Sequence, residues 1–259
     1  MWDCDMETTS LVRNRYWVLR HGMSVSNERG LIVSSMENGR RAEFQLVAEG
    51  VKQAKLAGEL FLKALMENNI PLENVRICYS PFSRTTHTAK VIASRLNLPF
   101  DGPQCKCFAW ALLMVELAAA RGRSLDFAGQ AMEDLKERFL GPSLELKSHD
   151  EHPEIRALDA IATDPFMGPE GGESIDDVAS RVTNAMTAME SEFQGCAVLI
   201  VSHGGPLQVL QSILNAVKQH PASSSDGDLA SKLQVVRVPS ILSQHRKFAL
   251  LMGELRPLI

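Results

Sequence analysis

Three segments of the chain repeat one pattern: a short, almost continuous apolar run, a turn that carries polar side chains, and a stretch with helical periodicity. The apolar runs cover residues 16–19, 75–79 and 197–201. Such runs are typical of strands in a parallel sheet whose two faces are both covered, and their alternation with helices indicates what covers them. The pattern therefore predicts an α/β fold, a three-layer α/β/α sandwich with a mostly parallel central sheet.

The spacing of apolar residues also predicts where the covering helices lie. One apolar face runs over each of residues 51–65, 89–96, 178–193 and 207–217. Pro206 suits the first turn of the last helix, where a missing backbone N–H costs nothing. Two short strands are expected over residues 234–238 and 247–251, where they would extend the sheet edge. The one flexible-looking segment, residues 221–228, is too short to prove a domain boundary, and we expect residues 1–259 to form a single domain.

Composition narrows the class of protein. Lysine and arginine number 27 against 31 acidic residues, a net charge of −4, whereas nucleic-acid binders usually carry a strong basic excess. We therefore expect no nucleic-acid partner. The five cysteines are scattered without a CxxC pair, so neither a disulfide framework nor a zinc site is expected, and a reducing compartment fits best.

The start of the chain and its apolar stretches indicate where in the cell the protein is expected. The chain starts with the acidic residues Asp3, Asp5 and Glu7, unlike a secretory signal or a transit peptide. The longest apolar stretch, over residues 108–120, contains Glu116 and is shorter than the ~20 residues that a membrane span needs. We expect a cytoplasmic protein without membrane contact.

Charged side chains follow the three apolar runs. Arg20 and His21 come after the first, Arg84 after the second and His203 after the third. Ligands of open parallel sheets bind at the carboxyl ends of the strands, so these turns are expected to converge. Arginine binds the oxygens of a phosphate dianion with two parallel hydrogen bonds, and a glycine follows each histidine, which allows close approach of the backbone to a ligand.

Four motifs carry a resemblance to a known family. They are residues 19–22 (Leu-Arg-His-Gly) with Ser24 and Asn27, residues 80–89, residues 171–174 (Gly-Gly-Glu-Ser) and residues 201–205 (Val-Ser-His-Gly-Gly). In order and spacing, over about residues 13–252, the chain resembles the histidine phosphatase superfamily, also called the phosphoglycerate mutase-like family. The resemblance implies the phosphoglycerate mutase-like version of the predicted sandwich.

The resemblance also implies roles for the residues in these motifs. His21 would be the nucleophile and become a phosphohistidine, while Arg20, Arg84 and His203 would stabilise the transferred phosphoryl group. The phosphate-binding set would comprise Arg20, Ser24, Asn27, Arg84, His203 and Gly204. Because the protein supplies the positive charge itself, we expect neither a metal ion nor a cofactor.

The proton donor for the leaving oxygen is identified by a fifth motif. In the family this acid lies in a Leu-x-Glu-Arg-x-x-Gly-like stretch, which residues 135–141 fit, so Glu137 would be the general acid. Glu116 and Glu133 are rivals, but neither has a glycine four residues later. The alternative interpretation of Glu137 is a solvated acid on a helix.

One departure from the family pattern is an insertion. Relatives reach the acid soon after a strand that would end here near residues 98–100, but this chain adds an apolar, helix-prone stretch over about residues 107–131. A helix that is apolar nearly all round must be buried. The stretch could be a lid, an interface or a gene-model artefact, and it makes a homodimer a hypothesis to test.

The sequence favours a metal-independent phosphomonoesterase that acts on a small phosphorylated metabolite. Mutases of the family present an extra basic cluster after the acid, but no adjacent arginine pair occurs between Gly141 and Gly171. A phosphoglycerate mutase activity and a catalytically impaired phospho-ligand binding protein stay open as alternatives. Substrate selectivity is assigned to the loops over residues 31–44 and 144–167.

Some remaining polar residues are given roles as well. His149 or Lys147 is expected to contact the distal part of the substrate, whereas His87 is expected to be structural or to lie behind the residues that contact the substrate. His220 and His245 are interpreted as surface residues.

Overall fold

The computed structural model describes residues 11–100, 128–149, 164–219 and 228–258. A five-stranded sheet with the order β3-β2-β4-β1-β5 forms the central layer. The strands are β1 (Arg15–Arg20), β2 (Val75–Tyr79), β3 (Gly129–Ala131), β4 (Ala197–Ser202) and β5 (Leu255–Pro257). The first four strands in this order are parallel, and β5 pairs antiparallel with β1 at the edge.

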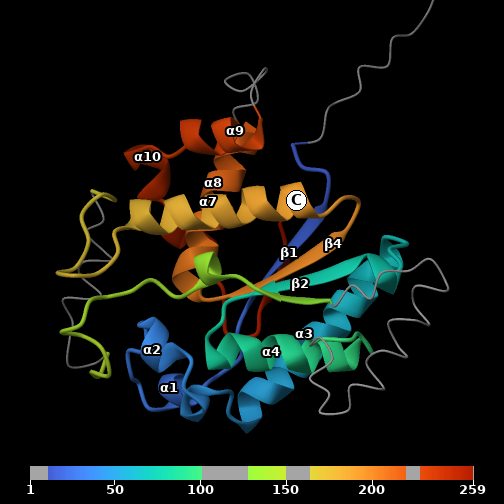
Figure 1. The fold of residues 1–259 in the computed structure, drawn as a ribbon, viewed down its shortest axis with the longest axis horizontal. Coiled ribbons are helices and arrows are strands. Elements are labelled where there is room, and N and C mark those ends of the chain that lie inside the picture. Colours follow the sequence, from blue (N-terminus) through green and yellow to red (C-terminus); the bar gives the residue numbers. More distant parts are fainter. Residues whose placement is uncertain (1–10, 101–127, 150–163, 220–227, 259) are drawn as a thin grey trace, which may run out of the picture.

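Helices cover both faces of the sheet. In Figure 1, α3 and α4 lie on one side of the strands and α7 and α8 on the other. The long helices are α3 (Ala48–Glu67), α4 (Ser83–Arg95), α7 (Ile175–Glu192) and α8 (Gly204–Gln219). The short ones are α1 (Val25–Glu28), α2 (Met36–Gly39), α9 (Leu229–Val235) and α10 (Pro239–Leu242), with 3-10 turns at Ala42–Phe44, Leu72–Asn74, Glu133–Leu135 and His245–Phe248.

The two faces of each strand belong to two different cores. On β1, Tyr16 and Val18 pack in the cluster formed with α7 and α8, while Trp17 and Leu19 pack in the cluster formed with α3 and α4. Successive side chains of a strand point to opposite faces, so a strand covered on both faces must be apolar throughout. This is the physical origin of the continuous apolar runs, and the predicted three-layer sandwich is confirmed.

The two strands predicted near the end of the chain are wrong. Residues 234–238 contain the end of α9 and the turn into α10, because Leu233 and Val236 recur at helical spacing and pack into the α7/α8 core. Residues 247–251 include the end of a 3-10 turn. The edge strand β5 instead lies a few residues later, where Leu255 pairs with Leu19.

The strand expected to end near residues 98–100 is also wrong. After α4, Asn97 adopts a positive φ of 54° and the Leu98 N–H donates to the Ala93 carbonyl at 2.9 Å, which ends the helix in a turn. A strand forms instead at the end of the predicted insertion. This is β3, in which Gly129 pairs with Ile77 of β2. Residues 107–127 of that insertion lie outside the described residues.

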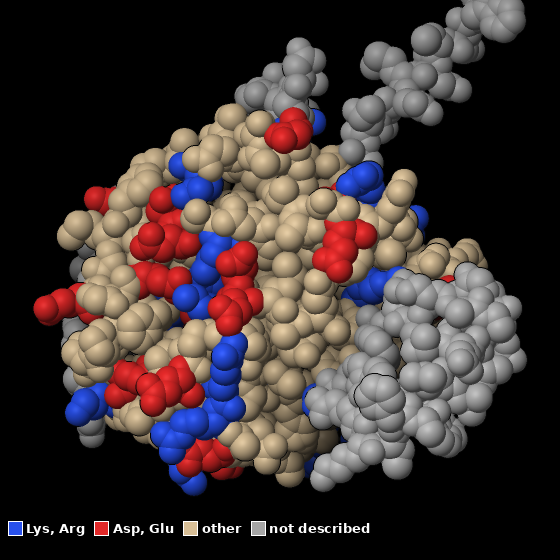
Figure 2. Space-filling model, viewed as in Figure 1, with Lys and Arg blue, Asp and Glu red and all other residues tan. Residues whose placement is uncertain are grey.

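The described helices and surface add two observations. No helix in the described ranges is long and apolar enough to cross a membrane. On the face shown in Figure 2, basic and acidic side chains alternate over the left half.

Candidate active site

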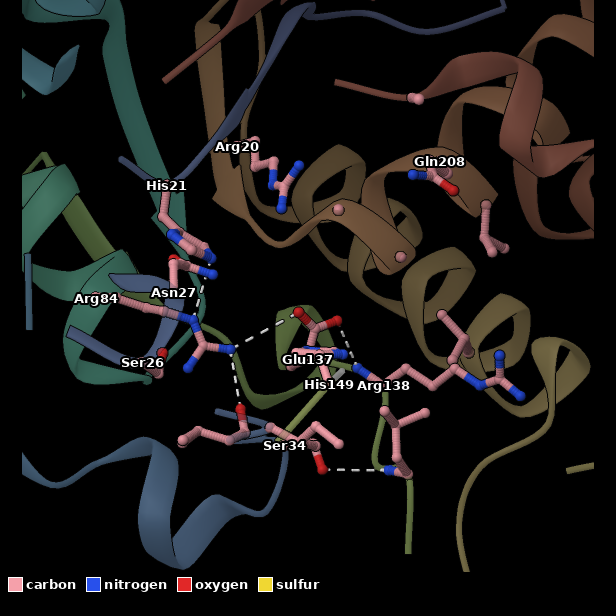
Figure 3. Close-up of a pocket in the computed structure, with 18 of the residues that line it drawn as sticks. Arg20, His21, Ser26, Asn27, Ser34, Arg84, Glu137, Arg138, His149 and Gln208 are labelled. Atoms are coloured by element: carbon pink, nitrogen blue, oxygen red, sulfur yellow. Dashed lines mark hydrogen bonds and ion pairs between the residues drawn. The ribbon is translucent and has the colours of Figure 1, made fainter. Parts of the chain in front are cut away.

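The three polar turns predicted to converge lie next to one another. Strands β1, β4 and β2 are neighbours in the sheet, with β4 between the other two, and each turn follows the carboxyl end of its strand. A cavity of about 470 Å³ opens there, as Figure 3 shows. Its lining includes the predicted site residues Arg20, His21, Asn27, Arg84, Glu137 and Gly204.

His21 is held in one orientation at this edge. The side chain is buried, with 2% exposed, and its Nδ1 lies 2.8 Å from the Gly22 carbonyl oxygen. A carbonyl can only accept, so Nδ1 carries the proton and Nε2 carries the lone pair. Burial, followed by the nearby Arg84, lowers the pKa of His21 well below its usual range. The ring is therefore neutral, with an electron pair on Nε2.

Gly22 is required by the packing around this histidine. A Cβ at this position would lie 2.4 Å from the Gly50 carbonyl oxygen, closer than any real contact. Glycine thus allows the turn after β1 to pack against the start of α3.

Arg84 approaches the same nitrogen from the first turn of α4. Its Nε–H donates to His21 Nε2 at 3.1 Å and its Nη2 donates to the Val33 carbonyl at 3.1 Å. The guanidinium carbon lies 5.0 Å from the centre of the Phe82 ring. Burial lowers the pKa of Arg84 to about 10, so the side chain stays charged at neutral pH.

Arg20 supplies a second cation from the end of β1. Its Nη1 donates to the Leu250 carbonyl at 2.8 Å. Burial lowers the pKa of Arg20, and the Glu137 carboxylate opposes this shift.

His203 follows β4 and is fully buried. Its Nε2 lies 2.8 Å from the Ser80 hydroxyl, and its ring meets the His21 ring edge to face at a centroid distance of 5.2 Å. Burial, with a further contribution from Arg84, lowers the pKa of His203 well below its usual range. His203 does not line the cavity, but its Nδ1 lies 3.6 Å from Oε2 of Glu137, which does.

Three buried nitrogens around this end of the cavity have no hydrogen-bond partner within the described structure. Arg20 Nε and Arg84 Nη1 are donors, and His203 Nδ1 is a donor when the Ser80 hydroxyl donates to His203 Nε2. Leaving a buried donor unpaired costs about 1–3 kcal/mol, and more for charged groups. The three belong to residues that the sequence analysis assigned to a phosphoryl group. An anion with several oxygens is the ligand that would satisfy them together.

Glu137 lies in the loop after the 3-10 turn Glu133–Leu135 rather than on a helix. Its Oε1 accepts the Arg138 N–H at 2.9 Å, and its Oε2 lies 3.7 Å from Arg84 Nη2. The carboxylate is 24% exposed. It therefore lies between the solvent and the unpaired donors, where it could pass a proton to or from a bound ligand.

The Ser24 and Asn27 pair has a structural role that the sequence analysis did not assign. Ser24 is buried and caps α1, and it is not among the residues that line the cavity. Asn27 Oδ1 accepts hydrogen bonds from the Ser24 N–H at 3.2 Å and hydroxyl at 2.7 Å. The amide NH₂ of Asn27 is therefore the group that can donate to a ligand in the cavity.

The cavity is also lined by polar residues that the sequence analysis did not assign to the site. They are Ser26, Ser34, Arg138, Gln208, His245 and Arg246. The interpretation of His245 as a surface residue is wrong, because its side chain is 3% exposed and its Nδ1 lies 2.7 Å from the Leu242 carbonyl oxygen. Of the two residues expected to contact the distal substrate, His149 lines the cavity and Lys147 does not. His220 lies outside the described residues.

One wall of the cavity is held by a carboxylate. Glu145 accepts hydrogen bonds from the backbone N–H and hydroxyl groups of Ser34 and Ser35, and from the Asn38 amide. Burial alone would raise the pKa of Glu145, but these hydrogen bonds outweigh it and hold the pKa below its usual range. The Ser34 hydroxyl also accepts the Leu140 N–H at 3.2 Å. Ser34 is therefore bonded both to Glu145 and to the loop that carries Leu140.

A metal site is not formed by the described side chains. Within the described ranges, no group of three or more histidine, cysteine, aspartate or glutamate residues is placed to hold an ion. The positive charge that faces the cavity comes from arginine.

Comparison with known proteins identifies similar chains. The sequence model of the histidine phosphatase superfamily (branch 1) matches residues 16–102 and 115–236. A metal-independent phosphoserine phosphatase from Arabidopsis thaliana is 26% identical over 240 residues, which cover 92% of this chain and 81% of the relative.

Solved structures share the fold. A mycobacterial glucosyl-3-phosphoglycerate phosphatase in complex with VO3 superposes with a TM-score of 0.54 at 20% identity, covering 78% of this chain and 81% of its own. The product of an open reading frame of Mycobacterium tuberculosis superposes with a TM-score of 0.55 at 21% identity, covering 93% and 89%.

Proposed function

Since the chain belongs to the histidine phosphatase superfamily, we propose that it hydrolyses phosphate monoesters of small metabolites through a phosphohistidine on His21, without a metal ion. One observation carries the proposal. Three buried nitrogens without a hydrogen-bond partner, Arg20 Nε, Arg84 Nη1 and His203 Nδ1, belong to the residue before His21, to the arginine bonded to its Nε2 and to the histidine whose ring packs against it. A phosphoryl group held by these donors would present its phosphorus to the nucleophile.

Binding must first free the nucleophile. Arg84 Nε donates to the lone pair of His21, and Arg84 Nη2 faces the Glu137 carboxylate at 3.7 Å. An incoming phosphate offers Arg84 stronger acceptors than either partner. The substrate therefore replaces His21 as the acceptor of Arg84, and the Nε2 lone pair becomes available for attack.

In the first step, His21 Nε2 attacks phosphorus. As the N–P bond forms, the bond between phosphorus and the ester oxygen breaks, and the protonated carboxyl of Glu137 gives its proton to that oxygen. The alcohol leaves, and His21 carries the phosphoryl group.

In the second step, water attacks the phosphohistidine. The Glu137 carboxylate takes a proton from this water, the N–P bond breaks and its electron pair returns to His21. Inorganic phosphate is released, and Glu137 has regained the proton that it gave to the leaving group.

His203 supports the bound phosphoryl group as a donor. The Ser80 hydroxyl accepts the Phe82 N–H at 3.4 Å, so its own proton can go to His203 Nε2. The Nδ1 of His203 then carries the N–H that faces the anion. A dianion next to this ring also favours its protonated form.

The proposal also concerns the class of substrate, the location of the protein in the cell and its oligomeric state. The name of the Arabidopsis relative supports a small phosphorylated metabolite as substrate. A cytoplasmic location, the absence of a nucleic-acid partner and the homodimer hypothesis stay predictions, and sedimentation at micromolar concentration would contradict the dimer if it showed a monomer.

The proposal is tested by hydrolysis of an aryl phosphate in excess chelator. We expect wild-type turnover that survives the chelator and is lost by about 10⁴-fold in His21→Ala, as for removal of a nucleophile. The matched control is His87→Ala, because His87 does not line the cavity. Chelator-resistant turnover that survives in His21→Ala would overturn the assignment of the nucleophile.

A further inference from the structure

Resting on the proposed function, we infer that Arg181 and Glu173 are positioning residues for the general acid: their buried ion pair holds the loop that carries Glu137 without touching the substrate. Glu173 belongs to the motif at residues 171–174, and the proposed mechanism gives this glutamate no role.

The acid comes from a segment that cannot hold its own shape. The 3-10 turn Glu133–Leu135 ends two residues before Glu137, and residues 136–147 form no helix or strand. Proton transfer needs the carboxyl within about 2.6–3.2 Å of the leaving oxygen, and a misplacement of about 1 Å can cost about 100-fold in rate. Contacts with other parts of the fold must therefore place the acid.

Arg181 holds the chain just before Glu137. It lies on α7 with 7% exposed, and its Nη1 donates to the Asp134 carbonyl at 2.7 Å and to the Lys136 carbonyl at 2.8 Å. One guanidinium nitrogen thus binds two carbonyls of the segment that leads into the acid. The rigid, planar fork of arginine fixes the direction of both bonds.

Glu173 holds the chain just after the acid. Its Oε2 accepts the Phe139 N–H at 2.9 Å, and its backbone N–H donates to the Phe139 carbonyl at 2.8 Å. The two loops approach this closely because residue 172 is a glycine: a Cβ on Gly172 would lie 2.7 Å from the Phe139 carbonyl oxygen.

The two positioning side chains also hold each other. Arg181 Nε and Nη2 donate to the two carboxylate oxygens of Glu173 at 2.9 and 3.1 Å, a bidentate, charge-assisted pair. Their side chains are 9% and 16% exposed. Neither residue is among those that line the cavity, so both act through Glu137.

The held loop places the carboxylate at the catalytic edge of the sheet. The Ser202 hydroxyl donates to the Leu135 carbonyl at 2.7 Å, which ties the same loop to the end of β4. Glu137 Oε2 then lies 3.6 Å from His203 Nδ1, and Figure 3 shows the carboxylate facing Arg84.

The test separates the acid from the nucleophile by the leaving group. Formation of the phosphohistidine is followed in single turnovers with glycerol 3-phosphate, whose alkoxide needs a proton, and with 4-nitrophenyl phosphate, whose leaving group does not. Arg181→Lys keeps the charge but loses the fork. The rate with glycerol 3-phosphate is expected to fall by about 100-fold, and the rate with 4-nitrophenyl phosphate to stay within about threefold of wild type.

A double-mutant cycle shows whether Arg181 acts through the acid. Arg181→Lys combined with Glu137→Gln is expected to react with glycerol 3-phosphate as slowly as Glu137→Gln alone, because an absent acid cannot be misplaced. If Arg181 affected the rate by another route, the two losses would multiply.

Two further variants guard against an effect on folding. Arg181→Met with Glu173→Gln removes both charges together, so that no buried ion is left unpaired, and is expected to show the same selective loss. The matched control is Arg237→Lys. Arg237 pairs with Asp176 of the same helix at 2.8 Å with 13% of its side chain exposed, but it bonds to Asp176 and Gln234 rather than to the loop of the acid, so wild-type rates are expected.

Each outcome decides a different claim. Wild-type rates, an equal loss for both esters in Arg181→Lys, or losses that multiply in the cycle overturn the positioning role and leave the phosphatase. Loss of the cooperative urea transition in both Arg181→Lys and the variant without the ion pair also overturns it, because the pair would then hold the fold as a whole. Wild type that reacts with 4-nitrophenyl phosphate alone overturns the acid role of Glu137 and this inference with it. No turnover of either ester by folded wild type overturns the proposed function itself.

Discussion

Two parts of the cavity lining are built in different ways. At the phosphate end, His21, Arg84 and His203 follow strand ends and are at most 3% exposed. Elsewhere in the lining, His149 comes from a loop and Arg246 from a short 3-10 turn, and Arg246 is exposed. Chemistry that needs fixed geometry lies on the rigid scaffold, whereas recognition of the variable part of the substrate lies on connecting segments.

After loss of the nucleophile, removal of the proton donor at the phosphate end is expected to have the largest effect. In Glu137→Gln, hydrolysis of an alkyl phosphate is expected to fall by about 10³-fold, because the alkoxide must leave without a proton. Formation of the phosphohistidine from an aryl phosphate is expected to change little, since a nitrophenolate leaves unaided. Single-turnover kinetics with both esters measure this difference, and an equal loss for both would contradict the acid role.

Arg84 is expected to follow in size. Arg84→Ala removes a buried donor that would face the phosphoryl oxygens, so kcat/KM should fall by about 100-fold or more. Arg84→Lys keeps the charge but not the fork and should recover only part of the loss. The control Arg95→Ala removes an exposed arginine of the same helix that pairs with Glu59. If Arg84→Lys behaves as wild type, the bidentate geometry is not needed.

Substitution of Glu145, which holds one wall of the cavity, is expected to change substrate binding more than the chemical step. Glu145→Ala removes the acceptor that holds Ser34 and Ser35, and KM is expected to rise about tenfold with a smaller change in kcat, because the wall moves while the nucleophile stays. Glu145→Gln keeps some acceptor capacity and should lie between the two. Glu49→Ala, at an exposed surface ion pair, serves as the control. A loss confined to kcat would place Glu145 in the chemistry instead.

The smallest effect concerns pH and stability. The pKa values of His21 and His203 are lowered in the folded chain, chiefly by burial. Below about pH 6.5 the unfolded chain therefore binds protons that the folded chain does not. As the pH is lowered through this range, the free energy of unfolding falls by up to about 1.4 kcal/mol per pH unit for each histidine. Above that pH the contribution of these two groups is constant.

Urea unfolding between pH 5 and 7.5 measures this slope. The double variant His21→Asn, His203→Asn is expected to flatten it. Saturating inorganic phosphate is expected to reduce it in the wild type, because the anion favours protonated histidine. A wild-type slope that the double variant leaves unchanged would show that other groups control it.

The same contrast explains how much the sequence could predict. The phosphate end was predictable because strand, turn and helix follow one another locally, so the order of residues alone places Arg20, His21, Arg84 and His203 at one sheet edge. Even there, Ser24 was assigned to the phosphate although it caps α1. The hydrogen bonds of the cap depend on side-chain geometry that spacing does not reveal.

The rest of the lining was not predictable. His245 and Arg246 reach the cavity through a 3-10 turn packed on α8, and no periodicity marks such a contact. The predicted tail strands over residues 234–238 and 247–251 failed for the same reason, since short apolar runs fit a strand or a helix equally well. Tertiary packing, here Leu233 against the α7/α8 core, decided between them.

The most direct test of the account is to trap the phosphoenzyme. Glu137→Gln mixed with an aryl phosphate, quenched in alkali and digested, is expected to carry close to one phosphoryl group per chain on His21, because the first step proceeds while the water-activating carboxylate is missing. The same experiment with His21→Ala, Glu137→Gln is expected to show no label. Label on His203 or on another residue, or none in Glu137→Gln while wild type turns over the ester, would contradict the assignment of His21 as the nucleophile.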